Sequence, residues 1–417
     1  MVTQPLRTLI VEPARDGHWH YTTSMARALA QRGVDVRMAA VFPYEVLEGA
    51  EEIPVSIVGR RRDGAPNRPW YAYRRLLEHS EKILGLLRII REFHPTVVHM
   101  HGILGSLDFV YFRLIRLLGA RVVYTAHDLS PSYRFDVFNR LRYRAADLMV
   151  VHSSNSVDRL RDYGVEKSKI VEIPHASLFP IARDVALPRE VAKASLALPP
   201  GARVVLFFGR IEPRKGLDLL IDAHADLCRE HSSVYLIIAG KPSKGFATHR
   251  ERIAEDGLSG RVILDLRYVP FERMRTYFSA ADVVALPYRT IYQSHVLQWA
   301  YAFGRPVVVT DVGGLREAVA ADGTGLIVGE EDRGELARAI LTLLSDESLA
   351  RAMGDRALHL TRTKYSWEAV SEMLEGSYRS LLAGDSDTRM AAVHSVKGSA
   401  QEIERLREMP TGDPTQR

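Results

Sequence analysis

The sequence predicts an α/β protein built from two doubly wound domains, each a parallel sheet covered by helices. Three observations predict this fold. The chain has 417 residues, which is too long for one ordinary hydrophobic core. Short β-branched runs alternate with longer amphipathic segments, as they do in β-α-β units. This alternation breaks once, near residue 180, and then restarts.

The first half contains six runs that predict buried strands. They are apolar on both faces, as expected for a parallel sheet with helices on both sides. The predicted strands are RTLIVE, VDVRMAAV, TVVHMH, RVVYTA, LMVVHS and KIVEIP. We expect helices between them, beginning near residues 21, 71, 104, 135 and 155. Together these segments predict a first domain over residues 1–180.

A stretch with several prolines, residues 181–202, predicts the connector between the domains. Six more runs then predict a second domain over residues 203–365: RVVLFFG, VYLIIAG, RVILDL, DVVALP, RPVVVT and TGLIVG. Residues 366–384 predict a helix that crosses back to the first domain, and the polar residues 385–417 predict a mobile tail. We expect a cleft between the domains, where the carboxyl ends of both sheets face each other.

Composition excludes several classes of protein. The chain is 46% hydrophobic and 26% charged, which is typical of a globular protein and not of a fibre or a disordered chain. No uninterrupted apolar run of about 18 residues predicts a bilayer span, and the segment LRTLIVEP predicts no secretion signal. The single cysteine, Cys228, cannot form an internal disulfide. We therefore expect a cytoplasmic protein. Association with the inner face of the membrane is a further expectation.

Positive charge is concentrated between residues 60 and 92. This stretch has nine basic and four acidic side chains, so its net charge of +5 equals that of the whole chain. Apolar residues recur at helical spacing within it, which predicts a basic amphipathic helix. One interpretation is a core-facing helix with a solvated basic face; the other is a helix attracted to anionic lipid head groups. No nucleic-acid motif accompanies the charge, so we expect no nucleic-acid partner.

The segment VVLFFGRIEPRKGLDLLIDAH, residues 204–224, predicts an anion site. A buried strand ends at Gly209, and a helix begins near Gly216. The side chains of Arg210 and Lys215 therefore emerge at the carboxyl end of the strand, beside a helix N-terminus. Two cations next to free N–H groups suit a diphosphate. Two solvated cations in a loop are the alternative interpretation.

From Arg7 to about Leu382 the chain resembles the retaining nucleotide-sugar glycosyltransferases of family 4, which have the GT-B architecture. Gly209, Arg210, Lys215 and Gly216 match that family's Gly-Arg-x-x-x-x-Lys-Gly element in type and spacing. Further matches are YVP at 268–270, FSAADVVALPY at 278–288 and AYAFGRPVVVTDVGGLREAV at 300–319. The resemblance implies that the Gly-Arg-Lys-Gly element binds the diphosphate of a nucleotide-sugar donor, and that the backbone near Tyr268 and Val269 contacts its base.

The chain departs from the family where two glutamates are usual. The Ala-x-Ala-x-Gly-x-Pro segment beginning at Ala300 places those positions at Ile291 and Trp299. The second glutamate normally accepts hydrogen bonds from both ribose hydroxyls, and an indole N–H only donates. We expect Ser294 to cap a helix whose first N–H groups, on His295, Val296 and Leu297, hold a β-phosphate. Gln298 and Gln293 are candidate substitutes in ribose or sugar recognition; the alternative for Gln298 is simple packing.

Several side chains in the first half are candidates for the acceptor site. The segment GHWHYT carries Gly17, His20 and Tyr21 just after the first strand. His101 and His127 end later strands on the same edge, and the resemblance implies that His127 approaches the transferred sugar. We expect His99 to be a satisfied core histidine and His175 to lie near the crossover between the domains. His18 and His20 lack a nearby carboxylate pair, so we expect no metal.

These observations predict a glycosyltransferase that moves a sugar from a nucleotide diphosphate donor to an acceptor hydroxyl, with retention of anomeric configuration. His127, Arg210 and Lys215 are the predicted catalytic residues, and no metal or other cofactor is expected. A lipid-linked acceptor or a polysaccharide precursor is the expected acceptor class. Two alternatives remain: a catalytically silent relative that binds nucleotide or a partner transferase, and a GT-B epimerase or coupling enzyme.

Overall fold

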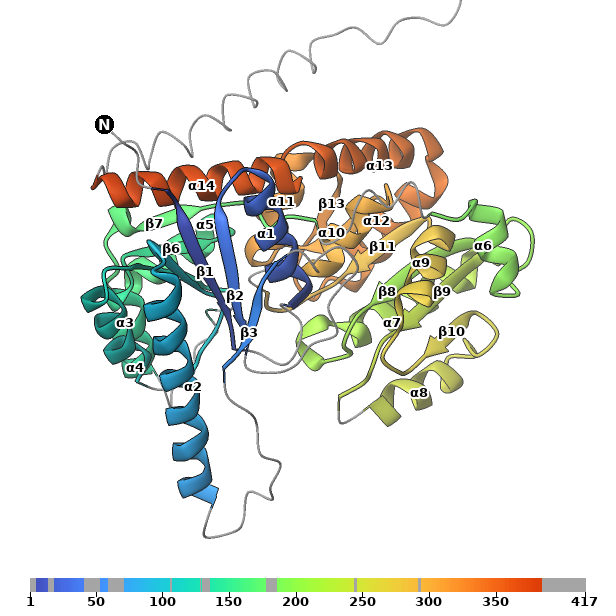
Figure 1. The fold of residues 1–417 in the computed structure, drawn as a ribbon. Helices are drawn as coiled ribbons and strands as arrows, with labels where there is room; N and C mark the ends of the chain where they lie inside the picture. Colours follow the sequence, from blue (N-terminus) through green and yellow to red (C-terminus); the bar gives the residue numbers. More distant parts are fainter. Residues whose placement is uncertain are drawn as a thin grey trace, which may run out of the picture. The chain divides into compact units, whose positions relative to one another are not determined.

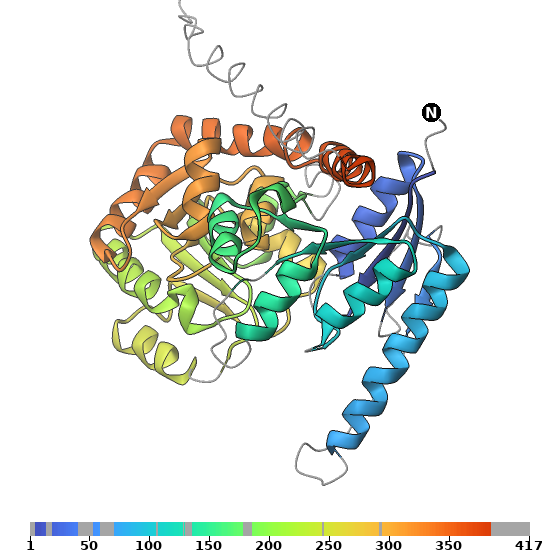
Figure 2. The same cartoon turned by 90° about the vertical axis from the view of Figure 1, so that its left-hand side faces the viewer.

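A computed structural model of the chain describes residues 5–13, 19–40, 53–58, 71–105, 107–127, 129, 136–177, 186–243, 246–291 and 294–384. Within them the chain divides into two compact units (Figures 1 and 2). The first takes in the chain up to Val151, Ser156–Pro174 and the chain from Trp367; the second takes in His152–Asn155 and His175–Ser366. The two Rossmann-like units confirm the predicted fold class.

The first unit is built on a seven-stranded parallel sheet in the order β3-β2-β1-β4-β5-β6-β7. Six strands match the predicted runs. The prediction missed β3, which has three residues and is only partly buried, so neither its length nor its pattern marks it. The strands are β1 (Arg7–Glu12), β2 (Asp35–Ala40), β3 (Val55–Ile57), β4 (Val97–Met100), β5 (Arg121–Thr125), β6 (Leu148–Val151) and β7 (Ile170–Glu172).

The helices of the first unit connect these strands in β-α-β fashion. They are α1 (Trp19–Gln31), α2 (Tyr71–Phe93), α3 (Asp108–Leu117), α4 (Asp136–Ala145), α5 (Ser154–Asp162), the short 3₁₀ helix η1 (Lys167–Lys169) and α14 (Trp367–Ala383). Figure 1 shows α14 beside α1. Arg32, directly after α1, pairs with Glu375 on α14 at 2.7 Å, and the rings of Tyr21 and Trp367 are 5.0 Å apart. The last helix therefore belongs to the first unit, although it follows the second in sequence.

The second unit is built on a six-stranded parallel sheet in the order β10-β9-β8-β11-β12-β13. Chain order reverses between β8 and β11, and the carboxyl ends of these neighbouring strands are the usual place for a ligand. The strands are β8 (Arg203–Phe208), β9 (Val234–Ala239), β10 (Val262–Asp265), β11 (Val283–Leu286), β12 (Val307–Thr310) and β13 (Gly325–Val328).

The helices of the second unit cover both faces of its sheet with apolar side chains. Burial on both faces is the reason that its strands are continuous apolar runs. The helices are α6 (Arg189–Ser195), the 3₁₀ helix η3 (Pro213–Lys215), α7 (Leu217–Glu230), α8 (Phe246–Glu255), α9 (Phe271–Ala280), α10 (His295–Ala302), α11 (Gly313–Asp322), α12 (Arg333–Ser345) and α13 (Glu347–Arg362).

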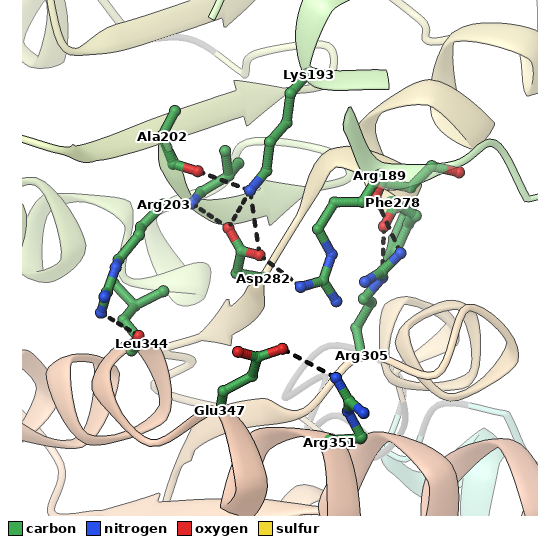
Figure 3. Close-up of polar contacts among 12 residues, drawn as sticks. Arg189, Lys193, Ala202, Arg203, Phe278, Asp282, Arg305, Leu344, Glu347 and Arg351 are labelled. Carbon is green, nitrogen blue, oxygen red and sulfur yellow. Dashed lines mark hydrogen bonds and ion pairs between the residues drawn. The ribbon is translucent and has the colours of Figure 1, made fainter. Parts of the chain in front are cut away.

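Part of the expected connector is an integral element of the second unit. Residues 189–195 form α6, which packs against α9. The ammonium of Lys193 donates to the Ala202 carbonyl at 2.7 Å and pairs with Asp282 at 3.0 Å. Arg189 reaches the same carboxylate at 3.0 Å, and Figure 3 shows both cations converging on it. The prediction of a connector is wrong for these residues. Prolines surround the short helix, and its partners, α9 and Asp282, are distant in sequence.

Some expectations fall outside the described residues. They are the connector over 181–185, the charged segment before Tyr71 and the tail over 385–417. Of the helices that the structure describes, none combines the length and the apolar character needed to span a bilayer.

Candidate active site

The loop after β8 requires glycine at both of its ends. Gly209 has φ +99° and Gly216 has φ +62°, a region that other residues adopt with strain. A Cβ on Gly216 would lie 1.9 Å from the carbonyl oxygen of Pro287. A Cβ on Gly209 would lie 2.9 Å from Nζ of Lys215 and 3.3 Å from Cγ2 of Val296. The backbone at Gly209 thus lies against both Lys215 and the first turn of α10.

Lys215 is the buried cation of this loop. Its side chain ends the 3₁₀ helix η3 and is only 7% exposed. The ammonium nitrogen lies 5.2 Å from the centroid of the Tyr288 ring, and no carboxylate of the described residues is within ion-pair distance of it. A buried ammonium without a counter-ion is costly. The positive charge of Lys215 is therefore available to bind an anion.

Arg210 is placed differently. Its side chain is 66% exposed, and its Nε lies 3.8 Å from a carboxylate oxygen of Glu212. Glu212 also pairs with Arg214 at 2.8 Å. The structure therefore brings Lys215 and Gly209 together but leaves Arg210 on the surface beside an acid. Sequence reasoning missed this role of Glu212, although the residue lies only two positions from Arg210.

The start of α10 has the expected capping geometry. Ser294 is the N-cap, and its hydroxyl accepts from the backbone N–H of Leu297 at 3.4 Å. The Leu297 N–H, which we expected to hold a β-phosphate, is therefore used by the cap. His295 and Val296 open the helix, and Val296 is the residue that approaches Gly209. The N–H groups of a first helical turn attract anions. The first turn of α10 and the buried ammonium of Lys215 therefore both lie against Gly209.

The two positions where the resembled motif carries glutamate belong to the apolar core. Ile291 and Trp299 both pack against the cluster on one face of the second sheet. The Trp299 ring lies 6.1 Å from the Phe271 ring and 6.2 Å from the Phe278 ring. Packing contacts therefore take the place of acidic side chains on α10, at Trp299, and before it, at Ile291.

Gln298 faces a small cavity of about 40 Å³. Its side chain is 6% exposed, and its Oε1 has no hydrogen-bond partner among the described residues. The cavity is lined by His152, His175, Ser294, Leu297, Gln298, Gly314, Leu315 and Ala318. Gln293, the other candidate substitute, lies outside the described residues.

Three histidines meet beside this cavity. The Nδ1 of His175 contacts the Ala176 carbonyl at 3.0 Å and must donate to it, so the Nε2 of the neutral ring is an acceptor. His295 approaches that nitrogen with its own Nε2 at 3.0 Å and therefore donates. The ring of His152 lies 5.1 Å from that of His175. Sequence reasoning missed His152, because more than a hundred residues separate it from α10.

In the first unit, three predicted acceptor-side residues lie together. Tyr21 is 2% exposed, and its ring is 5.9 Å from His101 and 5.5 Å from His127. Nδ1 of His101 is 3.2 Å from Nε2 of His127. Burial raises the pKa of the Tyr21 hydroxyl, which therefore stays protonated as a donor.

The other first-unit candidates are placed as follows. His20 is exposed on α1, and Gly17 lies outside the described residues. His99 is fully buried, with Nδ1 at 2.6 Å from the Tyr378 hydroxyl and Nε2 at 2.7 Å from the Thr125 hydroxyl. It is a satisfied core histidine, as predicted.

The candidate base-contact segment follows β10. Tyr268 is 80% exposed, whereas Val269 packs against the apolar core of the second unit. An exposed aromatic ring is available for stacking, and the neighbouring valine fixes the backbone.

Two family models match the chain. The model described as Glycosyltransferase Family 4 matches residues 15–176, and the model described as Glycosyl transferases group 1 matches residues 188–359. The chain is 32% identical to the D-inositol 3-phosphate glycosyltransferase of Corynebacterium glutamicum, over 88% of this chain and 92% of that protein. It is 36% identical to the protein of the same name from Nocardia farcinica, over 57% of this chain. That alignment spans only 53% of the Nocardia protein.

Solved structures share the fold. Sucrose-phosphate synthase from Thermosynechococcus elongatus superposes with a TM-score of 0.73 at 21% identity, over 91% of this chain and 100% of that chain. Anabaena HepE in complex with UDP superposes with a TM-score of 0.71 at 18% identity, over 90% of this chain and 100% of that chain. At such identities the likeness establishes the architecture.

Proposed function

The chain belongs to glycosyltransferase family 4, and from this premise we propose that it transfers a sugar from a nucleotide diphosphate donor to an acceptor hydroxyl. The observation that carries the proposal is the meeting of Lys215, Gly209 and the first turn of α10. A buried ammonium and a helix N-terminus are together a site for the donor's diphosphate.

Charge development explains why these groups would accelerate the reaction. As the bond between the sugar C1 and the phosphate oxygen breaks, the leaving nucleoside diphosphate gains negative charge. Lys215 and the N–H groups of His295 and Val296 stabilise that charge more in the transition state than in the ground state. Arg210 is exposed, and it adds a second cation when it leaves Glu212. With these cations the reaction needs no metal to neutralise the diphosphate.

The first unit would supply the acceptor side. His101, His127 and Tyr21 offer donors and acceptors for sugar hydroxyls, and His127 is the candidate that approaches the transferred sugar. Retention of anomeric configuration is part of the proposal, and its support is the motif resemblance. The acceptor hydroxyl would then attack from the face that the diphosphate leaves, positioned rather than activated by a strong base.

We place the acceptor in one of two chemical classes. The relatives named as D-inositol 3-phosphate glycosyltransferases suggest a phosphorylated polyol. The positive charge over residues 60–92 instead suggests a lipid-linked or polysaccharide-precursor acceptor at an anionic membrane surface, reached from the cytoplasm.

One observation favours a second function, that of a catalytically silent nucleotide-binding relative. Ile291 and Trp299 have no carboxylate to offer to a sugar or a ribose. Against this alternative, the buried ammonium of Lys215 is expensive to keep unless an anion uses it.

Calorimetry with UDP, GDP, ADP and dTDP tests the proposal. We expect at least one of them to bind the full chain, and a wild-type protein that ignores all four would refute it. The donor sugar of the nucleotide that binds is then offered with inositol 3-phosphate or with a lipid extract. Release of nucleoside diphosphate that depends on the acceptor supports the transferase, whereas binding without release supports the silent relative.

A further inference from the structure

The outer surface of α3 is apolar where a surface helix is normally charged. Its exposed side chains recur every three or four residues, which places them in one stripe. They are Leu107, Val110, Leu114, Leu117 and Leu118. Leu117 is 82% exposed, far more than a side chain that serves the core.

This stripe is distinct from the face that holds α3 to its unit. Phe112 and Ile115 are each 1% exposed and point into the core of the first unit. The helix is therefore apolar on two separate sides, and the core uses one of them. A row of exposed apolar side chains on one helix is a candidate interaction site.

Helix α4 also carries exposed apolar side chains and is fixed to α3. Val137 is 69% exposed and Leu141 is 41% exposed. Arg142 on α4 pairs with Asp108 on α3 at 3.0 Å, with side chains 3% and 1% exposed. This buried pair holds the two helices in one orientation. Figures 1 and 2 show α3 and α4 side by side at the edge of the first unit, next to α2.

Exposed positive charge surrounds the stripe. Four arginines are exposed on the two helices, and a fifth, Arg121, is exposed at the start of β5; the four are Arg113, Arg116, Arg140 and Arg144. Among the side chains that the structure describes on α3 and α4, Asp108 is the one carboxylate, and it is buried; the side chain of Asp136, the first residue of α4, lies outside them. Asp147, which follows α4, is 10% exposed; it pairs with Arg116 at 3.5 Å and Arg121 at 3.8 Å and accepts from the backbone N–H of Val122.

We propose that this surface, the α3–α4 face, docks on an anionic lipid bilayer. Leucine and valine side chains enter the boundary between head groups and acyl chains, while the arginines pair with lipid phosphates. A second copy of this chain fits the surface poorly, since a two-fold contact would set arginines against arginines. The described part of α2 is a weaker candidate: Leu84 is its one exposed large apolar side chain, and Arg88 is paired with Glu92 at 2.7 Å.

Vesicle flotation of the full chain tests the proposal. The vesicles are phosphatidylcholine alone, or phosphatidylcholine with about a third phosphatidylglycerol. The variants are Leu114→Gln/Leu117→Gln on the stripe, Arg113→Gln/Arg140→Gln on the charges, and Leu84→Gln on α2 as a matched control.

We expect wild type and Leu84→Gln to float only with the anionic vesicles. Each double variant should partition at least about tenfold more weakly, and added salt should weaken wild-type binding. Three results for the wild type would overturn the proposal. They are a failure to float, equal binding to neutral vesicles, and formation of dimers that Leu114→Gln/Leu117→Gln abolishes. Equal flotation of the stripe variant and wild type would also overturn it. Nucleotide binding is measured on every variant, so a failure here is separate from a failure of the proposed transferase.

Discussion

Lys215→Met removes the ammonium from the loop after β8 and keeps a chain of similar length. Lys215 is 7% exposed, and the described residues offer it no carboxylate. The substitution should therefore act in opposite directions on two measured quantities. Nucleotide binding should weaken because the anion loses its buried counter-charge. The free energy of unfolding without ligand should hold steady or rise, because an unpaired charge leaves the interior.

The magnitudes follow from burial. Losing one partner of a desolvated charge pair costs about 2–5 kcal/mol of binding. The N–H groups of α10 remain, so we take the lower part of that range, about 2–3 kcal/mol, which is a Kd about 30 to 150 times higher. Without ligand we expect the protein to be up to about 1 kcal/mol more stable, as when buried charges are replaced by apolar groups.

Calorimetry with the nucleoside diphosphate that binds wild type gives the first quantity, and urea unfolding without nucleotide gives the second. Arg214→Met is the matched control, since Arg214 is 46% exposed and paired with Glu212. It should change Kd less than about threefold. An unchanged Kd in Lys215→Met, or a large loss of its stability, would show that the ammonium serves the fold and not the ligand.

Three further substitutions test the surroundings. Gly209→Ala should weaken nucleotide binding at least about tenfold in calorimetry, because its Cβ would lie 2.9 Å from Lys215 Nζ at φ +99°. Gly201→Ala, at φ +76° with nothing within 4 Å, controls for backbone strain. Burial lowers the pKa of His224 from 6.5 to about 4, so the stability it contributes is present above pH 6.5 and is lost as pH falls towards 4. Urea unfolding should show a loss of about 2 kcal/mol between about pH 7 and pH 4.5 that His224→Leu lacks. Lys193→Met should lower the free energy of unfolding by about 1–3 kcal/mol, since Asp282 keeps Arg189. Arg351→Met, in an exposed pair with Glu347, should change it little.

Most of the fold follows from local pattern. A buried parallel strand is a short continuous apolar run, and the chain has twelve such runs that the structure places in its two sheets. The strand β3 was not predicted, because its three partly exposed residues form no continuous apolar run. Helix α6 was not predicted, because prolines surround it and Asp282, which pairs with its Lys193, lies about ninety residues away.

The sequence predicts those site residues whose place is set by the end of a strand or the start of a helix. Gly209 and Lys215 lie where the end of β8 and the start of α7 put them, and Ser294 caps α10 as its side chain favours. Partners brought in by tertiary contacts were not predictable. Tyr288 lies beside Lys215, and His152 joins His175, only because the folded chain places them there. Likewise the periodicity of α3 gives an apolar helix but not which of its two apolar sides is buried.

The loss of the two acidic positions leads to one more prediction about the donor. Lys215 is positioned by Gly209, Gly216 and Tyr288, none of which lies on α10, so replacing the acids leaves the ammonium in place. Trp299, packed between aromatic rings, cannot accept a hydrogen bond from a ribose hydroxyl. Nucleotide binding should therefore depend on the diphosphate and little on the 2′-hydroxyl.

UDP and dUDP, or the matching pair for the base that binds, test this prediction in calorimetry. We expect their Kd values to differ by less than about fivefold, since a neutral hydrogen bond to the missing hydroxyl would be worth about 1 kcal/mol or more. A preference of about thirtyfold or more for the ribonucleotide would mean that another acceptor has replaced the glutamate. Gln298 would then be the first residue to substitute, because its Oε1 has no partner among the described residues.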